Sequence, residues 1–213
     1  MLPEILYEDS ALLALNKPAG MPVQPDPTGD TSLLDLASRH TGTPMHLVHR
    51  LDRPVGGAVL LAKTAEAMTH LTAQFQQHAV DKTYLALVSA APPATEGTLT
   101  HYIRKSGKSN KSILLDEPQP GAVEAALHYR LLHQTDRYWL LEVRPQSGRH
   151  HQIRAQLAAV GCPVRGDVKY GARRGNPDRS IQLHAWKLAF EHPKTGEWME
   201  VVAPTPDQAF WKV

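Results

Sequence analysis

The chain has 213 residues, 42% of them hydrophobic and 21% charged, and its net charge is only +2. This size and composition fit one globular domain, or two closely joined lobes, with a substantial core. No run of about 18 apolar residues occurs, so no membrane span is expected. The N-terminus has neither the basic nor the apolar region of a signal peptide. The single cysteine, Cys162, excludes an internal disulfide and predicts a reducing, cytoplasmic location.

The charge is distributed unevenly along the chain. Between residues 144 and 179 there are eight basic residues against two aspartates, whereas residues 1–48 hold six acids against Lys17 and Arg39. A basic half on a nearly neutral chain is typical of phosphate binding. A solvated charged face explains the count equally well, so charge alone leaves a nucleic-acid partner open.

The first part of the chain predicts two short strands, a stiff loop and a helix. The strands are Glu4–Tyr7 and Leu12–Leu15. The loop is the proline-rich segment NKPAGMPV at residues 16–23, where Lys17 suits either a phosphate contact or a structural role. Thr31 or Ser32 then caps a helix with apolar positions at 33, 34, 36 and 37, which ends near residue 42.

The segment HRLDRPVGG, residues 49–57, precedes a short apolar run that predicts a buried strand, Ala58–Ala62. Asp52 therefore lies on a loop just ahead of a core strand, between Arg50 and Arg53. Nearby positive charge lowers the pKa of a carboxyl group, so Asp52 suits a nucleophile or an electrostatic anchor. As an isolated string, it would more often be a surface carboxylate paired with its neighbours.

Beyond this loop, Thr64 caps a predicted helix that runs to about Ala79, with a buried face. That face consists of Met68, Leu71, Phe75 and Ala79. The alternating segment Asp81–Val88 predicts a strand that carries Tyr84. Residues 104–121 are basic and rich in serine, proline and glycine, which indicates a mobile loop or hairpin.

Two antiparallel strands are predicted next, Ala122–Leu132 and Tyr138–Val143. The second leads into a helix that Ser147 caps and Gly161 ends, with an apolar face at 153, 157 and 160. Arg149 lies on that face one turn earlier, where it opposes the helix dipole. An inward arginine needs a carboxylate partner, and Asp52 is the obvious one. Asp167 is expected in a turn, and the last strands lie around residues 181–185 and 198–202.

Other kinds of site are not supported by the residue spacing. The histidines and Cys162 match no zinc pattern, so we expect no metal. Neither a P-loop nor a dinucleotide-binding glycine motif occurs. The string His49-Arg50-Leu51-Asp52 differs from the kinase H-R-D loop by an extra leucine, and the other kinase motifs are missing.

Five segments in the right order resemble the RluA-type pseudouridine synthases. They match the patterns N-K-P-x-G-x-x-V, H-R-L-D-x-x-T-S-G, K-x-Y-x-A-x-V, P-x-T-G-R-x-H-Q-I-R and H-P-I-x-G-D-x-x-Y-G at residues 16–23, 49–57, 82–88, 145–154 and 162–171. The segment L-H-A-x-x-L-x-F-x-H-P-x-T-G near the C-terminus also matches. Val55 and Gly56 replace the usual Thr and Ser, and Ser147 replaces a Thr.

The resemblance implies an α+β pseudouridine synthase fold over residues 1–213 as a single catalytic domain. In this fold a mixed, mostly antiparallel sheet carries helices and loops around an RNA-binding cleft. No S4-type module is expected, because the matching region begins at residue 4. The implied partner is ribosomal or transfer RNA, and the implied reaction turns uridine into pseudouridine without a cofactor. A monomer is the default expectation.

The resemblance also implies roles for individual residues. Asp52 would be the nucleophile or base, with attack on the sugar, attack on the base and formation of a glycal all left open. Tyr84 would pack against the flipped uracil, Arg149 would orient Asp52, and Arg50 would fill the space that the base vacates. The candidate RNA contacts are Arg50, Arg53, Arg154 and Lys17.

Two other functions compete with this one. The first is an RNA-binding protein that has lost catalysis, which the departures Val55 and Gly56 suggest. The second is a nucleoside hydrolase with Asp52 as nucleophile, which would release free uracil.

Overall fold

The computed structural model describes residues 1–207 and 209–211. By its internal contacts the chain divides into two compact units. The first unit comprises residues 1–82 and 184–205, and the second comprises residues 83–183 together with the C-terminal segment from Pro206. The first unit is therefore assembled from both ends of the chain.

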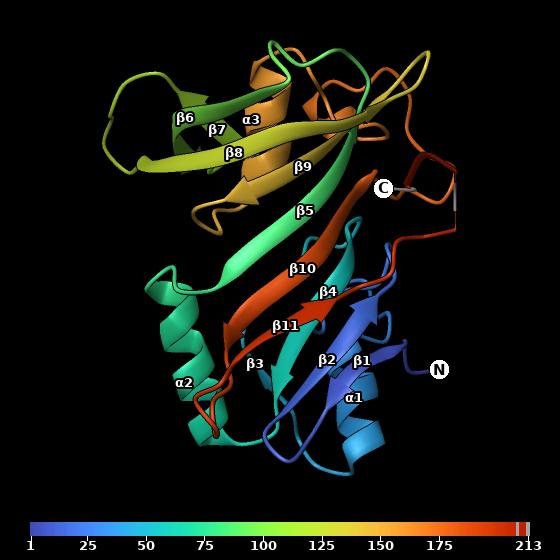
Figure 1. Ribbon diagram of the computed structural model, residues 1–213, viewed down its shortest axis with the longest axis vertical. Coiled ribbons are helices and arrows are strands. Elements are labelled where there is room, and N and C mark those ends of the chain that lie inside the picture. The colour runs from blue at the N-terminus through green and yellow to red at the C-terminus, as the bar shows by residue number, and fades with distance from the viewer. Residues whose placement is uncertain (208, 212–213) are drawn as a thin grey trace. The chain divides into compact units, whose positions relative to one another are not determined.

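The first unit contains a sheet with two helices (Figure 1). Its strands run in the order β1-β2-β4-β10, with β3 beside β4 and β11 beside β10. All pairs are antiparallel except β4 with β10, which is parallel. The elements are β1 (Ile5–Glu8), β2 (Leu12–Lys17), α1 (Leu33–Thr41), β3 (His46–Leu47), β4 (Gly56–Ala62), α2 (Ala65–Gln76), β10 (Leu183–Glu191) and β11 (Trp198–Val202).

Strand β4 is the centre of this unit, and every one of its residues is buried. A continuous apolar run is expected for a strand that is covered on both faces. Ala67 and Leu71 of α2 share a core cluster with residues of β2, β4 and β10, including Leu12, Leu60 and Phe190. The prediction that residues 58–62 form a buried strand is thus confirmed.

In the first unit the predicted starts of both helices are confirmed, but one predicted helix end is wrong. Ser32 caps α1 through a capping box with Asp35. The Thr64 hydroxyl accepts a hydrogen bond from the Ala67 N–H at the start of α2. Helix α2 ends at Gln76 rather than near Ala79, because His78 takes a left-handed backbone conformation (φ 58°). Ala79 is consequently exposed and does not belong to the buried face.

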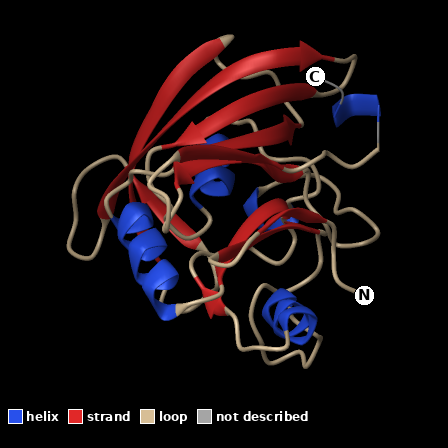
Figure 2. Cartoon of the chain, turned by 60° about the horizontal axis from the view of Figure 1, so that its bottom comes forward, coloured by secondary structure: helices blue, strands red, loops and turns tan. Residues whose placement is uncertain are grey.

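The second unit has antiparallel strands in the order β5-β9-β8-β6-β7. Helix α3 contacts β6, β7 and β9. Figure 2 shows the helices and strands of the chain by colour. The predicted basic segment is a hairpin, in which residues 106–111 join β6 to β7. The elements are β5 (Asp81–Val88), β6 (Glu96–Lys105), β7 (Ser112–Leu115), β8 (Val123–Gln134), β9 (Trp139–Pro145), α3 (Gln152–Ala159) and the 3₁₀ helices η1 (Val168–Tyr170) and η2 (Ala209–Trp211).

Candidate functional site

Asp52 lies on the loop between β3 and β4, as the sequence predicts. Its neighbours Leu51 and Val55 are buried, with 7% and 2% exposure, and anchor the loop in the core. Asp52 itself is only partly buried, and its carbonyl oxygen accepts a hydrogen bond from the Val55 N–H at 3.0 Å. The result is a carboxylate on a short, tightly held turn.

The Lys17 side chain is buried and binds the backbone of this loop, so it does not face solvent. Its side chain is 1% exposed, and its Nζ donates to the carbonyl oxygens of Pro18 (3.1 Å), Met21 (2.9 Å) and Arg53 (3.3 Å). Burial lowers the pKa of Lys17 to about 7, while the charge of Asp52 opposes that shift. An ammonium group enclosed by three carbonyls has a structural role, so we do not carry Lys17 forward as a phosphate contact.

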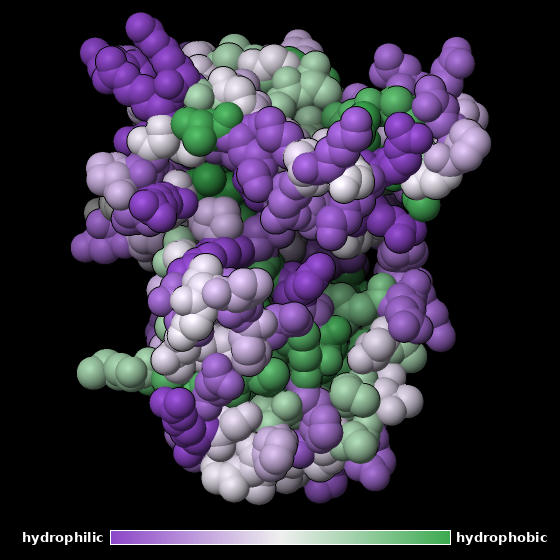
Figure 3. All heavy atoms as spheres, turned by 180° about the vertical axis from the view of Figure 1, so that it is seen from behind, coloured by the Kyte–Doolittle hydropathy of each residue, from purple (hydrophilic) through white to green (hydrophobic). Residues whose placement is uncertain are grey.

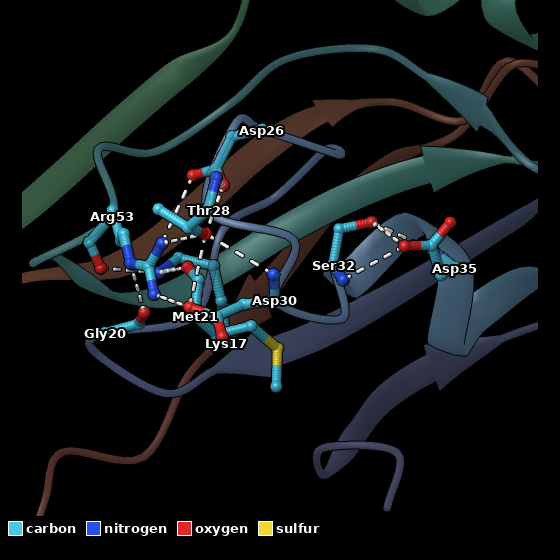
Figure 4. Close-up of polar contacts among 9 residues, drawn as sticks. All are labelled: Lys17, Gly20, Met21, Asp26, Thr28, Asp30, Ser32, Asp35 and Arg53. Atoms are coloured by element: carbon cyan, nitrogen blue, oxygen red, sulfur yellow. Dashed lines mark hydrogen bonds and ion pairs between the residues drawn. The ribbon is translucent and has the colours of Figure 1, made fainter.

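Arg53 is engaged within the protein as well. Its guanidinium donates to the carbonyl oxygen of Gly20 (2.8 Å), to Thr28 (2.7 Å) and to Asp26 (3.2 Å), and it also pairs with Asp30 (Figure 4). Hydrogen bonding to Asp30 raises the pKa of Arg53 further above its ordinary value. These contacts tie the 20–30 loop to the Asp52 loop, so Arg53 too is not carried forward as an RNA contact.

His49 has a role that the sequence did not reveal. Its Nε2 accepts a hydrogen bond from the Leu60 N–H of β4 at 2.9 Å, and its ring stacks on Phe75 of α2 at 4.6 Å. Burial lowers the pKa of His49 to about 3, which keeps the imidazole neutral at physiological pH. His49 therefore fixes the start of the Asp52 loop to the core strand. No spacing in the sequence pointed to this contact.

The two glycines at the end of the loop differ in what surrounds them. Gly57 has φ +115°, and a Cβ atom there would lie 2.2 Å from the carbonyl oxygen of Ala185 on β10. At Gly56 the nearest atom to a Cβ, the Lys17 carbonyl oxygen, would be at 3.3 Å. Only Gly57 is therefore required by close backbone approach. The departures Val55 and Gly56 both lie in the buried part of the loop.

The second unit carries Tyr84 and Arg149. Tyr84 lies on β5, opposite Val143 of β9, and is partly buried. Arg149 is exposed on the turn between β9 and α3. Because Asp52 belongs to the first unit and these two residues to the second, the predicted Arg149–Asp52 pair stays a prediction.

The predicted start of α3 is wrong. The helix begins at Gln152, with His151 at the N-cap position in a left-handed conformation and no side-chain cap. The Ser147 hydroxyl instead donates to Oε1 of Gln152 at 2.7 Å, and the same oxygen accepts from the Arg149 N–H at 3.2 Å. Arg149 thus precedes the helix and does not lie in its first turn, which removes the predicted conflict with the helix dipole.

Arg154, a predicted RNA contact, is buried at 4% exposure. Its Nε and Nη2 donate to the two carboxylate oxygens of Asp167 at 2.6 and 2.9 Å. The guanidinium also lies over the ring of Tyr170, 5.1 Å from its centre. A bidentate pair of this kind organises the core, so Arg154 is not carried forward as an RNA contact.

The basic character of the second unit resides in other residues. Much of the face shown in Figure 3 is covered by strongly hydrophilic side chains. Exposed basic residues of this unit include Lys105, Lys108, Lys111, Arg149, Arg173, Arg174 and Arg179. In the first unit, Arg50 is also exposed, on the Asp52 loop. Arg50 and Arg149 are therefore the predicted site arginines that face solvent.

Within residues 1–207 and 209–211, no group of three His, Cys, Asp or Glu side chains is placed to hold a metal ion. No helix in the same part of the chain has the length and apolar character needed to cross a membrane.

Comparison with known proteins identifies the family. The RNA pseudouridylate synthase family pattern matches residues 11–159. The chain belongs to the RNA pseudouridylate synthase family. An RNA pseudouridylate synthase is an isomerase that acts on RNA, so the predicted class of enzyme follows from the family. The resemblance seen in the sequence motifs is confirmed.

Bacterial relatives and a human structure support this assignment. An uncharacterized RNA pseudouridine synthase of Bacillus subtilis is 33% identical over 96% of this chain and 69% of its own length. The ribosomal large subunit pseudouridine synthase C of Vibrio parahaemolyticus is 32% identical over 94% of this chain and 65% of its own. The tRNA pseudouridine synthase C of Yersinia pestis is 32% identical over 94% and 85%.

The chain thus spans about two thirds of the length of the first two relatives. Among solved structures, human RNA pseudouridylate synthase domain containing 1 matches with a TM-score of 0.81 and 25% identity, over 98% of this chain and 86% of that one. The predicted α+β pseudouridine synthase fold is confirmed.

Proposed function

We propose that this chain isomerises uridine to pseudouridine in RNA, with Asp52 as the essential nucleophile or base and residues 1–213 acting as one catalytic domain. The observation that carries the proposal is the construction of the Asp52 loop. A partly exposed carboxylate stands on a turn that Leu51, Val55, Lys17 and His49 fix to the core. Such rigid placement is what a reacting group requires.

The reaction needs no external reactant. The bond between N1 of uracil and C1′ of ribose breaks, the base turns, and C5 is joined to C1′. The hydrogen on C5 leaves as a proton and N1 gains one, so product and substrate are isomers. Asp52 can serve by attack on the sugar, by attack on the base, or by taking a proton from the sugar to give a glycal.

The other residues have supporting roles in the proposal. Tyr84 packs against the flipped uracil and assists proton transfer, although a free phenol with a pKa near 10 is a poor base at neutral pH. Arg149 keeps Asp52 ionised and oriented. Arg50, exposed on the same loop as Asp52, fills the space that the flipped base leaves, because a guanidinium both stacks on bases and pairs with phosphate.

The substrate is proposed to be structured ribosomal or transfer RNA, acted on in the cytoplasm by a monomer. The named relatives include both a ribosomal and a transfer RNA enzyme, so their names do not choose between the two. The exposed basic residues of the second unit suit a phosphate backbone of either kind.

The test is tritium release from RNA labelled at uridine C5, with the wild type compared with Asp52→Ala and Asp52→Asn. We expect release by the wild type alone, while both variants still bind RNA. Loss of binding together with activity would refute the assigned role of Asp52. No release from ribosomal or transfer RNA by a wild type that binds them would favour the binding-only function, and free uracil would indicate a hydrolase.

A further inference from the structure

The hydroxyl group of Tyr170 joins three segments of the second unit. It accepts a hydrogen bond from the backbone N–H of Ser112 at 2.7 Å, and it shares another with Nδ1 of His151 at 2.9 Å. Tyr170 belongs to η1, Ser112 starts β7, and His151 immediately precedes α3. One phenol therefore connects the end of the basic hairpin turn to the turn that carries Arg149.

His151 is the residue that this contact holds in place. Its backbone is left-handed, with φ 52° and ψ 23°, a conformation that is unfavourable for a residue with a side chain. Its ring is 7% exposed, stacks on His150 at 3.7 Å and meets the Tyr170 ring edge-on at 5.5 Å. The surroundings of the side chain thus stabilise an unfavourable backbone only two residues after Arg149.

The hairpin is attached to the same turn by a second set of contacts. The hydroxyl of Ser112 lies in hydrogen-bond contact with the carbonyl oxygen and, at 3.0 Å, with Nδ1 of His150. Nε2 of His150 lies 2.9 Å from Oδ1 of Asn110, whose carbonyl oxygen accepts from Lys169 at 3.1 Å. The hairpin turn, residues 106–111, is therefore linked by hydrogen bonds to the Arg149 turn, residues 148–151.

The hairpin turn presents cations to solvent. Lys105, Lys108 and Lys111 are exposed at or beside it. Phosphate groups bound to these lysines would shift the hairpin turn. The shift would reach Ser112 and Asn110 and, through their contacts, His150 and His151. The contacts that connect the lysines to Arg149 are short hydrogen bonds and stacked rings at partly buried groups, which salt screens less than it screens exposed charges.

We propose that Tyr170 is a positioning residue, which fixes the direction of Arg149 through His151 and couples it to RNA phosphate bound on the hairpin lysines. The inference rests on the proposed function, in which Arg149 orients Asp52. The group formed by Tyr170, His151, His150 and Ser112 is called the latch below. Tyr170 does not touch the reacting atoms and acts only through the Arg149 turn.

The first test compares Tyr170→Phe with Tyr102→Phe. Tyr102 lies on β6 of the same hairpin, and its hydroxyl makes an exposed hydrogen bond to Glu124 at 3.2 Å, which makes it a matched control. Loss of the two partly buried hydrogen bonds of this hydroxyl should lower kcat for tritium release about tenfold in Tyr170→Phe, with KM changed much less. Tyr102→Phe should behave like the wild type. A change confined to KM, or an equal loss in both variants, would overturn the proposal.

A second comparison asks whether the effect passes through Arg149. In an Arg149→Lys background that retains measurable activity, adding Tyr170→Phe should cause little further loss, because the group that Tyr170 positions is already altered. A further loss of about tenfold, as in the wild-type background, would mean that Tyr170 acts elsewhere, and the positioning role would be wrong.

A third measurement does not depend on catalysis. Amide hydrogen exchange should be faster in Tyr170→Phe at Ser112 and at residues 149–152, and unchanged there in Tyr102→Phe. Unchanged exchange at these amides would refute the latch whatever happens to activity. If the wild type released no tritium from any RNA, the proposed function would fail, yet the exchange data would still decide whether the latch exists.

Discussion

The Asp52 loop and the Arg149 turn carry the two predicted groups of opposite charge, but they are held in different ways. Buried or paired cations fix the Asp52 loop, because Lys17 and Arg53 bind its backbone and the neighbouring 20–30 loop. The Arg149 turn is held mainly by the Tyr170 hydroxyl, the Ser112 hydroxyl and two stacked histidine rings, rather than by ion pairs with acids.

The two segments also differ in the kind of residue that occupies a left-handed backbone position. In the first unit a left-handed position is occupied by Gly57, where Ala185 leaves no room for a side chain. In the second unit such a position is occupied by His151, whose side chain is part of what maintains it. The Asp52 loop therefore depends on close packing and charge, whereas the Arg149 turn depends on a few hydrogen bonds and stacked rings. We therefore expect single substitutions to disrupt the Asp52 loop abruptly, and to weaken the Arg149 turn only gradually.

The largest effect is expected for Gly57→Ala. A Cβ atom 2.2 Å from the Ala185 carbonyl oxygen forces β4 and β10 apart, and the left-handed backbone adds strain. Together these should cost roughly 2–5 kcal/mol of unfolding free energy. Gly56→Ala is the matched control and should cost no more than about 1 kcal/mol. Chemical denaturation of the two variants measures the difference, and equal losses would show that this backbone contact is not limiting.

A smaller but still large effect is expected for Lys17→Met. Methionine is similar in length but removes the hydrogen bonds to Pro18, Met21 and Arg53, and of these carbonyls Arg53 still accepts from the Gly20 N–H, so the change should cost roughly 2–3 kcal/mol. Lys63→Met removes a lysine of the same unit that pairs with the partly exposed Glu8, and should cost less than about 1 kcal/mol. If thermal unfolding showed the same shift for both, the idea that a buried cation holds the Asp52 loop would be wrong.

The smallest effect is expected for Arg53→Gln. Its partners Asp26 and Asp30 are exposed or nearly so, and salt screens such pairs. Proteolysis within the 20–30 loop should be faster in the variant at low salt, and the difference should shrink as salt is added. The Tyr170→Phe phenotype should depend less on salt, because its hydroxyl makes partly buried hydrogen bonds and no exposed ion pair. A salt-independent Arg53→Gln effect would remove the distinction between support by exposed ion pairs and support by partly buried hydrogen bonds.

The sequence was informative where one short segment determines the structure. Ser32 and Thr64 cap their helices as predicted, and residues 58–62 form a buried strand, because caps and apolar runs are local signals. Asp52 is found on its predicted loop for the same reason. The family motifs, which occur along nearly the whole chain, allowed the whole fold to be predicted.

Predictions from the sequence were wrong where a side chain binds another partner than the one that its local pattern suggests. Ser147 is a good capping residue, but Oε1 of Gln152 takes its hydroxyl, and the helix starts later. Arg53 appeared to be a neighbour of Asp52, yet its guanidinium binds acids more than twenty residues earlier in the chain. Lys17 and Arg154 were predicted to contact RNA, but both are buried in the folded chain. Such partners depend on tertiary structure, which no local pattern encodes.

The parallel pairing of β4 with β10 has a consequence for how the protein is made. Gly56 and Gly57 pair with His184 and Ala185, so the strand behind Asp52 gains this neighbour only when the ribosome has released residues from the far end of the chain. Until then this edge of β4 lacks its pairing partner, and an unpaired strand edge favours aggregation. In the newly made chain this pairing can therefore form only after all of residues 83–183 have been synthesised.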